Sequence, residues 1–483
     1  MRKIYSKILI ALFALSVLML TSCNKYTDID PKGKNLLKTA AQLEYLLNYS
    51  FNSSSAFGSK YWYAIDNDSY VPMKNLATVL AGEKGWDYVC TTFDSTIDRA
   101  ALATTDAQYS TLYSIINTRL NVILQQAGVV TDNPSKVKQL SAEAYVLRAY
   151  LHFILVNVYA KAYDPATAAT DGGVPYMNKI NFDELAVKST VKQVYDNMLS
   201  DLDAAFALDA LPDQPASSLR IGKGFAYAVK ARVLLAMRNY SAALEAANKA
   251  LEYNSALEDH RTFLTPDNGG TGTGIIARDG IKAADNYFYA SSVFYNPSWY
   301  MAPPETAQYY ETGNIFRYYT DPYSYSEDYK SYYTNTEGAL LWYSYDYQQN
   351  SGGLTTADAY MVKAECLIRA GQISDGMDIL NAIRVNRIRP ADYEPISAAT
   401  VAEGMVYLKK VSRIEFLYTW RNFANIKRWN TEVAYREVIT RTITPNGSTE
   451  ASFTYTLPPG SKLWIFPFPQ TATNFNTNLT QNY

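Results

Sequence analysis

The chain is 483 residues long and 48% apolar, and its 44 basic residues nearly balance its 46 acidic ones. A chain of this composition can bury a large core, and the formal net charge of −2 gives no electrostatic reason to expect nucleic acid as a partner. The only histidines, His152 and His260, exclude a metal site built from several histidines and disfavour catalysis by a histidine triad. The 42 tyrosines and seven tryptophans are instead typical of a protein that holds a ligand at a wet surface.

The N-terminus has the pattern of a secretory signal. Arg2, Lys3 and Lys7 precede the apolar run 8–20, which is too short for a membrane-spanning helix of about 20 residues. We therefore predict that residues 1–22 are a signal peptide.

A lipid anchor is predicted directly after this signal. Leu20-Thr21-Ser22-Cys23 resembles a lipobox, so Cys23 is the expected lipidation site and residues 23–36 the tether to a membrane. The alternative is an ordinary signal peptide with a coincidental cysteine. Cys90 and Cys366 could form one disulfide, but two separate buried thiols are expected.

Several segments have the apolar spacing of helices. We expect helices over about 106–126, 135–163, 190–208 and 401–430. Thr190, followed three residues later by Gln193, has the pattern of a capping box at the start of the third helix.

The chain also contains an internal repeat. When residues 225–251 are shifted by 133 positions, Ala226, Tyr227, Ala231 and Leu234 fall on Ala359, Tyr360, Ala364 and Leu367. Small and large apolar residues at these spacings predict two tetratricopeptide-like helical pairs, with turns at 238–239 and 370–371. A generic helical hairpin is the alternative for each copy.

Between these helices the regular pattern disappears. Irregular structure is expected over 50–96 and 253–355, and the stretch 287–347 alone holds 16 of the tyrosines. The predicted architecture is a mostly α globular unit over 37–483, with an N-terminal part at 37–220 and a C-terminal part at 221–483. The aromatic-rich insert would cover about 253–355.

The loops provide the aromatic and polar residues that a sugar site needs. Sugars present an apolar face rimmed by hydroxyls, so flat rings beside Asp or Asn side chains suit them. The predicted ligand-binding residues are Trp62, Trp86, Trp299, Tyr300, Asp66, Asp68 and Asn296. Packing in the core is the alternative for each tryptophan, and it is the expectation for Trp342 and Trp464.

The remaining chemical signals point to a structural role. His152 lies on an apolar helix face and is expected to be a satisfied core histidine. The tyrosines over 309–347 suit either plain packing or contact with a protein partner. No catalytic residue, metal site or cofactor is predicted.

Motifs spread along the chain resemble the SusD/RagB family of nutrient-binding outer-membrane lipoproteins. Those that carry the resemblance are the post-lipobox start at 23–31, the "AEAxxLRAxxxF" helix at 142–153, the "GGVP" turn at 172–175, the "TVxxVY" helix at 190–195, the "RxE" and "RW" segments at 413–416 and 426–429, and the C-terminal "FPxP" segment at 465–470. The chain departs from the family pattern at Thr419-Trp420 and at Asn425.

The resemblance implies a fold and a role. The fold is mostly α, with about four tetratricopeptide-like pairs and irregular loops packed to one side. The role is capture of an oligosaccharide at the cell surface, without catalysis, by a lipoprotein of the outer membrane that is the partner of a SusC-like TonB-dependent transporter. A surface glycoside hydrolase, a receptor for a peptide nutrient and a scaffold for protein partners are the alternatives.

Overall fold

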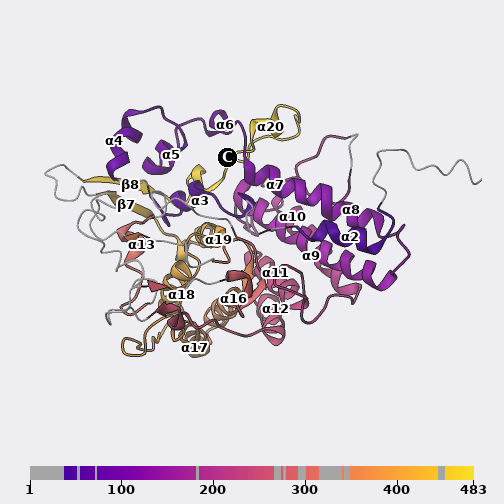
Figure 1. The fold of residues 1–483 in the computed structure, drawn as a ribbon. Helices are drawn as coiled ribbons and strands as arrows, with labels where there is room; N and C mark the ends of the chain where they lie inside the picture. The colour runs from indigo at the N-terminus through magenta and orange to yellow at the C-terminus, as the bar shows by residue number, and fades with distance from the viewer. Residues whose placement is uncertain are drawn as a thin grey trace, which may run out of the picture.

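Helices make up most of the regular structure in the computed structural model, and successive helices lie side by side as pairs (Figure 1). The structure describes residues 37–49, 51, 55–70, 73–180, 184–265, 274–275, 279–291, 301–314, 340–341, 349–443 and 452–483. In this part of the chain, no helix has both the length and the apolar character that a membrane span requires.

The first half of the chain is built around one buried helix. The helices are α2 (Ala40–Leu47), α7 (Ala107–Ile115), η3 (Ile116–Leu120), α8 (Asn121–Gln126), α9 (Pro134–Tyr159) and α10 (Val191–Ala207). Helix α9 is buried on nearly every face, and α2, α8 and α10 pack around it. The predicted helix 106–126 is present but passes through a π-helical turn at η3, and the capping box of Thr190 and Gln193 is confirmed.

The two copies of the repeat are the pairs α11 (Lys223–Ala236) with α12 (Tyr240–Tyr253) and α16 (Thr356–Arg369) with α17 (Ile373–Arg384). Arg238 (φ 61°) and Gly371 (φ 82°) end the first helix of each pair in the left-handed conformation. The following N–H groups, of Asn239 and Gln372, donate to the carbonyls of Leu234 and Leu367, each over 2.9 Å. Because these turns are 133 residues apart and identical in hydrogen bonding, the predicted repeat is confirmed.

The predicted helix 401–430 is wrong as a single element. The structure has α18 (Val401–Glu415) and α19 (Trp420–Trp429), separated by a short break. Tyr418 adopts a left-handed φ of 57°, and the Thr419 hydroxyl accepts a hydrogen bond from the N–H of Arg421, which starts the new helix.

The stretch 50–96, predicted to be irregular, contains short helices. These are η2 (Ser55–Phe57), α3 (Lys60–Ile65), α4 (Met73–Ala81) and α5 (Trp86–Thr92), followed by α6 (Arg99–Leu102). Near the C-terminus lie η7 (Val433–Tyr435), the antiparallel strands β7 (Ile439–Ile443) and β8 (Phe453–Leu457), η8 (Lys462–Trp464) and α20 (Gln470–Thr473). In Figure 1 the β7–β8 hairpin lies beside α4 and α5, although the two segments are far apart in the sequence.

The described parts of 253–355 lack long helices, as predicted. They contain η4 (His260–Phe263), η5 (Gly280–Lys282), α13 (Pro304–Ala307) and the strands β1 (Leu264–Thr265), β2 (Gly274–Ile275), β3 (Asn286–Phe288), β4 (Met301–Ala302), β5 (Leu340–Leu341) and β6 (Leu354–Thr355). The strands form the antiparallel pairs β1–β2, β3–β6 and β4–β5. The mostly α fold with paired helices and loop-rich regions is therefore confirmed.

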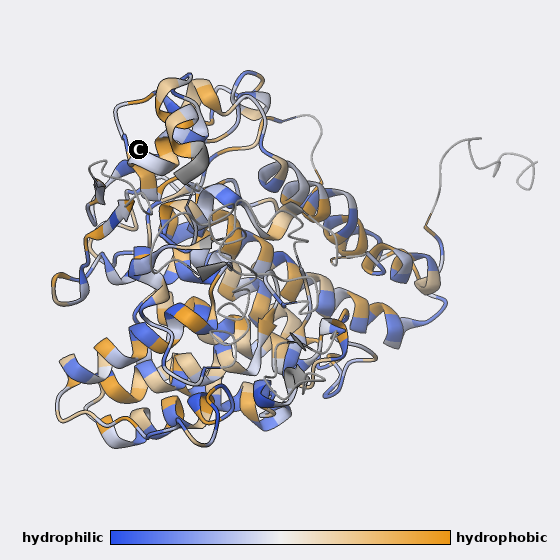
Figure 2. Cartoon of the chain, turned by 60° about the vertical axis from the view of Figure 1, so that its left-hand side comes forward, coloured by the Kyte–Doolittle hydropathy of each residue, from blue (hydrophilic) through white to orange (hydrophobic). Residues whose placement is uncertain are grey.

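A connected apolar core runs from α2 to the C-terminal segment, and the helices carry apolar and polar stripes (Figure 2). Charged residues of the sequence motifs are buried in this core as pairs. Glu143 accepts two hydrogen bonds from Arg220, of 2.7 and 2.8 Å, and Arg148 donates two to Asp201, of 2.6 and 2.7 Å. The motif charges therefore hold the helical frame together.

Candidate functional site

The predicted aromatic surface around Trp62 is not open in this structure. Trp62 is only 1% exposed and packs edge-on against Phe466, with ring centroids 6.4 Å apart. Asp66 and Asp68 are fully buried. Trp62 lies in α3, whose residues 62–65 are buried, and Asp66 and Asp68 directly follow this helix. Their burial argues against the predicted contact with a ligand.

The turn of Asp66 and Asp68 instead fixes the junction between α18 and α19. The Asp68 carboxylate lies 3.1 Å from Arg413 Nε and accepts hydrogen bonds from the N–H of Tyr418 and the amide of Asn422, both over 3.0 Å. Burial raises the pKa of Asp68 to about 6, although Arg413 and Asn422 partly offset this. Burial and the Asp68 charge raise the pKa of Asp66 well above its ordinary value.

Trp86 is half-buried and stacks against two other rings. Its ring centroid lies 5.3 Å from that of Tyr61 and 5.7 Å from that of Phe466, and Trp86 Nε1 donates to the carbonyl of Leu102 over 3.2 Å. Trp86 borders a cavity of about 340 Å³ that Trp62, Tyr61 and Lys60 also line. Contact of Trp86 with a ligand stays a prediction.

The other predicted site residues lie outside the described residues. They are Trp299, Tyr300 and Asn296, together with the predicted lipidation site Cys23 and the predicted core residue Trp342. Trp464 is buried, as expected. Cys90 and Cys366 are separate buried thiols, with pKa values raised by burial to about 12.

His152 is a satisfied core histidine, as predicted. Its Nδ1 lies 2.9 Å from the carbonyl oxygen of Arg148, and its Nε2 accepts the N–H of Met177 over 3.0 Å. Its ring stacks on Tyr176, with centroids 3.9 Å apart. Burial lowers the pKa of His152 to about 3, so the ring is neutral at pH 7.

A cavity of about 290 Å³, here called the central cavity, lies between the segment 279–291, the turn after α13, and helices α17 and α18. Its size is near the lower end of the ~300–1,000 Å³ typical of small-molecule sites. The sequence alone does not reveal this cavity, because its walls come from segments far apart in the chain. The one signal was Tyr309 at the start of the tyrosine-rich stretch, for which plain packing or a protein partner was predicted.

One wall of the central cavity is apolar. The side chains that line it come from α17, α18 and the connection between them: Ile383, Ile388, Ile396, Val411 and Ile414. The rings of Tyr309, Tyr407 and Phe416 line the same space. Tyr309 and Tyr407 are half-buried, so part of each side chain remains accessible.

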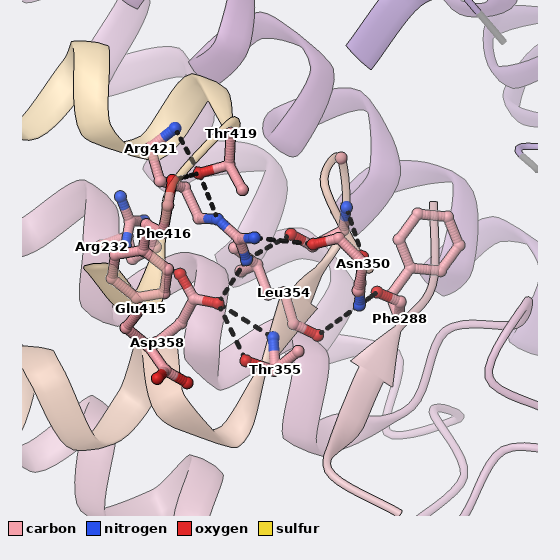
Figure 3. Close-up of polar contacts among 12 residues, drawn as sticks. Arg232, Phe288, Asn350, Leu354, Thr355, Asp358, Glu415, Phe416, Thr419 and Arg421 are labelled. Atoms are coloured by element: carbon pink, nitrogen blue, oxygen red, sulfur yellow. Dashed lines mark hydrogen bonds and ion pairs between the residues drawn. The ribbon is translucent and has the colours of Figure 1, made fainter. Parts of the chain in front are cut away.

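Amide side chains also line the central cavity. They belong to Asn286, Asn350, Gln349 and Asn314, and Asn314 pairs through its backbone with Ile388. Asn350 is held rigidly, because its Oδ1 accepts the N–H of Gly353 over 2.8 Å. Its Nδ2 donates to Asn286 Oδ1 over 2.8 Å and lies 2.9 Å from the carbonyl oxygen of Phe288 (Figure 3).

Arg421 fixes the turn that carries Asn350. Its Nη1 donates to Asp358 over 2.8 Å, and its Nη2 donates to the carbonyl of Asn350 over 2.6 Å (Figure 3). Asp358 is completely buried and also accepts a hydrogen bond from Arg232 over 2.9 Å. All the partners in this network are groups of the protein itself. The turn that carries Asn350 is therefore held in place before any ligand binds.

Two ion pairs neutralise four of the charges along the cavity wall, and the other charged residues that line it are two acidic, Glu258 and Asp285, and two basic, Lys410 and Arg421. Arg384 makes two hydrogen bonds to Glu311, of 2.6 and 2.9 Å, and Arg387 makes two of the same lengths to Glu415. Burial, reinforced by the Arg387 charge, lowers the pKa of His260 well below its ordinary value. The cavity therefore suits a neutral ligand with one apolar face and many hydrogen-bonding groups.

Two family models match the chain over most of its length. One, described as "Starch-binding associating with outer membrane", matches residues 25–235, and the other, described as "SusD family", matches residues 259–483. The chain belongs to the SusD/RagB family. Members of this family are binding proteins without catalytic activity, which supports the prediction that the chain is not an enzyme.

Individual relatives are distant from this SusD/RagB chain. "SusD-like protein P2" of Formosa agariphila is 26% identical over 264 residues, which are 53% of this chain and 48% of that protein. The match thus spans about half the length of this relative.

Solved structures share the fold. A SusD superfamily protein of Bacteroides thetaiotaomicron has a TM-score of 0.67 at 16% identity, covering 92% of this chain and 100% of the other. A SusD-like carbohydrate-binding protein of Bacteroides vulgatus has a TM-score of 0.62 at 14% identity, covering 92% of this chain and 98% of the other. The predicted family and fold are both confirmed.

Proposed function

We propose that this protein captures a neutral oligosaccharide in the central cavity and holds it without chemical change. The observation that carries the proposal is that one cavity combines apolar side chains of α17 and α18 with the amide side chains of Asn286, Gln349 and Asn314, next to the rigid turn of Asn350. A sugar ring has an apolar C–H face and a rim of hydroxyls, so it can satisfy both kinds of side chain at once.

The family relationship supports the same ligand class. The model that matches residues 25–235 is described as starch-binding, and the B. vulgatus structure is described as carbohydrate-binding. The ion-paired state of Glu311 and Glu415 also favours binding over hydrolysis, because a glycosidase needs one carboxyl group able to donate a proton and a second one free to react.

The location and partner of the protein are part of the proposal. Cys23 would carry the lipid that anchors the chain to the outer membrane, facing outward, and a SusC-like TonB-dependent transporter would receive the sugar. The lipobox-like sequence and the family description "associating with outer membrane" support this. Changing Cys23 to Ala should release the protein from the outer-membrane fraction and abolish its co-purification with a transporter. Continued membrane retention of the variant would contradict the anchor.

A single ring tests the proposed site. A soluble form lacking residues 1–23 is screened by calorimetry against linear oligosaccharides, including malto-oligosaccharides. Tyr407→Ala removes a half-buried ring from the cavity and should weaken binding about fivefold, since one stacked ring contributes on the order of 1 kcal/mol.

The matched control is Tyr45→Ala, because Tyr45 is 71% exposed on α2 and does not line the cavity. It should bind like the unchanged protein. Equal affinity of the Tyr407→Ala and Tyr45→Ala proteins would place the ligand elsewhere, and release of reducing sugar would favour the hydrolase.

A further inference from the structure

A second cavity lies next to the central cavity. It has a volume of about 370 Å³ and is lined by residues of α13, α18, α19 and the start of β7, among them Glu305, Val406, Lys409 and Thr440. Two neighbouring residues of α18 line different cavities: Tyr407 lines the central cavity and Val406 lines the second.

The two cavities share part of their walls. Gln308, Tyr309 and Lys410 line both of them. Gln308 and Lys410 are exposed and Tyr309 is half-buried, so solvent reaches the boundary between the two spaces. A ligand that fills the central cavity and is longer than it would therefore pass along Tyr309 into the second cavity.

Glu305, which lines the second cavity, has a carboxylate oxygen that can accept a hydrogen bond. Glu305 Oε1 accepts the backbone N–H of Thr442 over 2.6 Å, while Oε2 is buried and has no hydrogen-bond partner among the described residues. A buried carboxylate oxygen without a donor is costly, and a ligand hydroxyl could supply that donor. Lys409 is held by Glu437 and by the carbonyl of Tyr435, over 3.1 Å, so this charge is already matched.

We infer that the two cavities form one elongated binding site for a linear oligosaccharide of more than two sugar units. The units beyond Tyr309 lie in the second cavity, where a hydroxyl donates to Glu305 Oε2. This inference rests on the proposed function and adds to it a selection for chain length.

The test compares short and long members of the same sugar series. Calorimetry on the soluble form uses the di- and hexasaccharides of the malto-, cello- and xylo-oligosaccharide series. In the series that binds, the hexasaccharide should bind at least tenfold more tightly than the disaccharide. Val406→Trp fills the second cavity from an exposed position and should remove this difference while leaving disaccharide binding unchanged.

Two further variants provide a matched control and an alternative test. Val129→Trp, at a position 69% exposed that lines neither cavity, should behave like the unchanged protein. Glu305→Gln retains the shape of the side chain and should weaken hexasaccharide binding but not disaccharide binding. This variant tests the inference if the Val406→Trp protein does not fold.

The outcomes separate the inference from the proposed function. Equal affinity for di- and hexasaccharide, or an equal loss of both in the Val406→Trp protein, would overturn the elongated site while leaving sugar binding intact. Failure of all three series to bind, or a Tyr407→Ala protein with unchanged disaccharide affinity, would overturn both.

Discussion

Glu365 on α16 illustrates how single buried charges stabilise the helical frame. Its carboxylate accepts hydrogen bonds from Arg428 over 2.7 and 2.8 Å, from Arg369 over 2.8 Å and from the Trp429 indole over 3.2 Å. Burial alone would raise the pKa of Glu365, but the two arginines outweigh it and lower the pKa to about 2.

This shift predicts a specific loss of stability in acid. Because the folded pKa of Glu365 lies below its ordinary value of 4.5, the stabilisation is complete above pH 4.5 and is lost as the pH falls toward 2. The contribution is on the order of 3 kcal/mol. Glu365→Gln should therefore lower the urea midpoint strongly at pH 7 and much less near pH 2.5.

The control for this measurement is an exposed ion pair. Asp196→Asn removes the partner of Lys192 on the surface of α10, where solvent screens the interaction, and its urea midpoint should hardly change at pH 7. A Glu365→Gln protein as stable as the unchanged one at pH 7 would contradict the assigned role.

For single residues, burial and hydrogen-bond partners often cannot be predicted from the sequence. Trp62 and a surface tryptophan look alike in the sequence, because the burial of Trp62 depends on Phe466, which follows far along the chain. Asp66 and Asp68 were predicted to contact a sugar, but in the structure the Asp68 carboxylate binds Arg413 and Asn422. His152 was predictable, because its apolar neighbours on α9 show that the helix face is buried.

At the scale of elements, the repeated helical pairs were predictable and the joints between helices were not. The period of small residues on α11, α12, α16 and α17 is visible in the sequence, and the repeated turn follows from it. The break between α18 and α19 has no such signal, since the left-handed residue is Tyr418 and not glycine. The central cavity was equally hidden, because its walls form only when the segment 279–291 packs against α17 and α18.

The repeated turn makes a prediction about Gly371. A side chain in the left-handed conformation costs about 1 kcal/mol, and an added Cβ at Gly371 would meet no atom within 4 Å, so the backbone effect is isolated. Gly371→Ala should lower the free energy of unfolding by about 1 kcal/mol, measured from urea denaturation.

Gly128 provides the matched control for this substitution. An added Cβ there also meets nothing within 4 Å, but Gly128 does not have a positive φ. Gly128→Ala should therefore cost nothing or stabilise slightly. Equal losses in the two alanine variants would show that the left-handed turn does not set the stability at Gly371.

At the scale of the whole molecule, buried basic side chains join segments that lie far apart in the chain. Lys427 on α19 donates to the carbonyls of Asn157, over 2.7 Å, and Ala160 at the C-terminal end of α9. Arg99 donates to the carbonyl of Ile465 over 2.6 Å. Each side chain donates to main-chain acceptors that would otherwise be buried without donors, so these distant segments share one core.

Arg441 on β7 is the strongest test of this linkage. It is completely buried and lies over the Phe93 ring, and its guanidinium donates to the carbonyls of Ala64 and Cys90, the latter over 2.7 Å, and to Asn67 Oδ1 over 2.8 Å. Burial lowers its pKa to about 10, so it remains charged at pH 7. Arg441→Met should leave these acceptors without a donor, at roughly 1–3 kcal/mol for each.

The cost should appear first as local opening of the segment that Arg441 holds. Hydrogen exchange in the Arg441→Met protein should accelerate over residues 60–93 and β7 while α9 and the α11–α12 pair remain protected, because α9 packs mainly against α10, and α11 and α12 pack mainly against each other. Arg261→Met, which removes a half-exposed arginine paired with Asp259 two residues away, should leave exchange over 60–93 unchanged. Uniform acceleration along the whole chain in the Arg441→Met protein would instead show that the molecule opens as a single unit, and that Arg441 stabilises it as a whole without holding one segment in place.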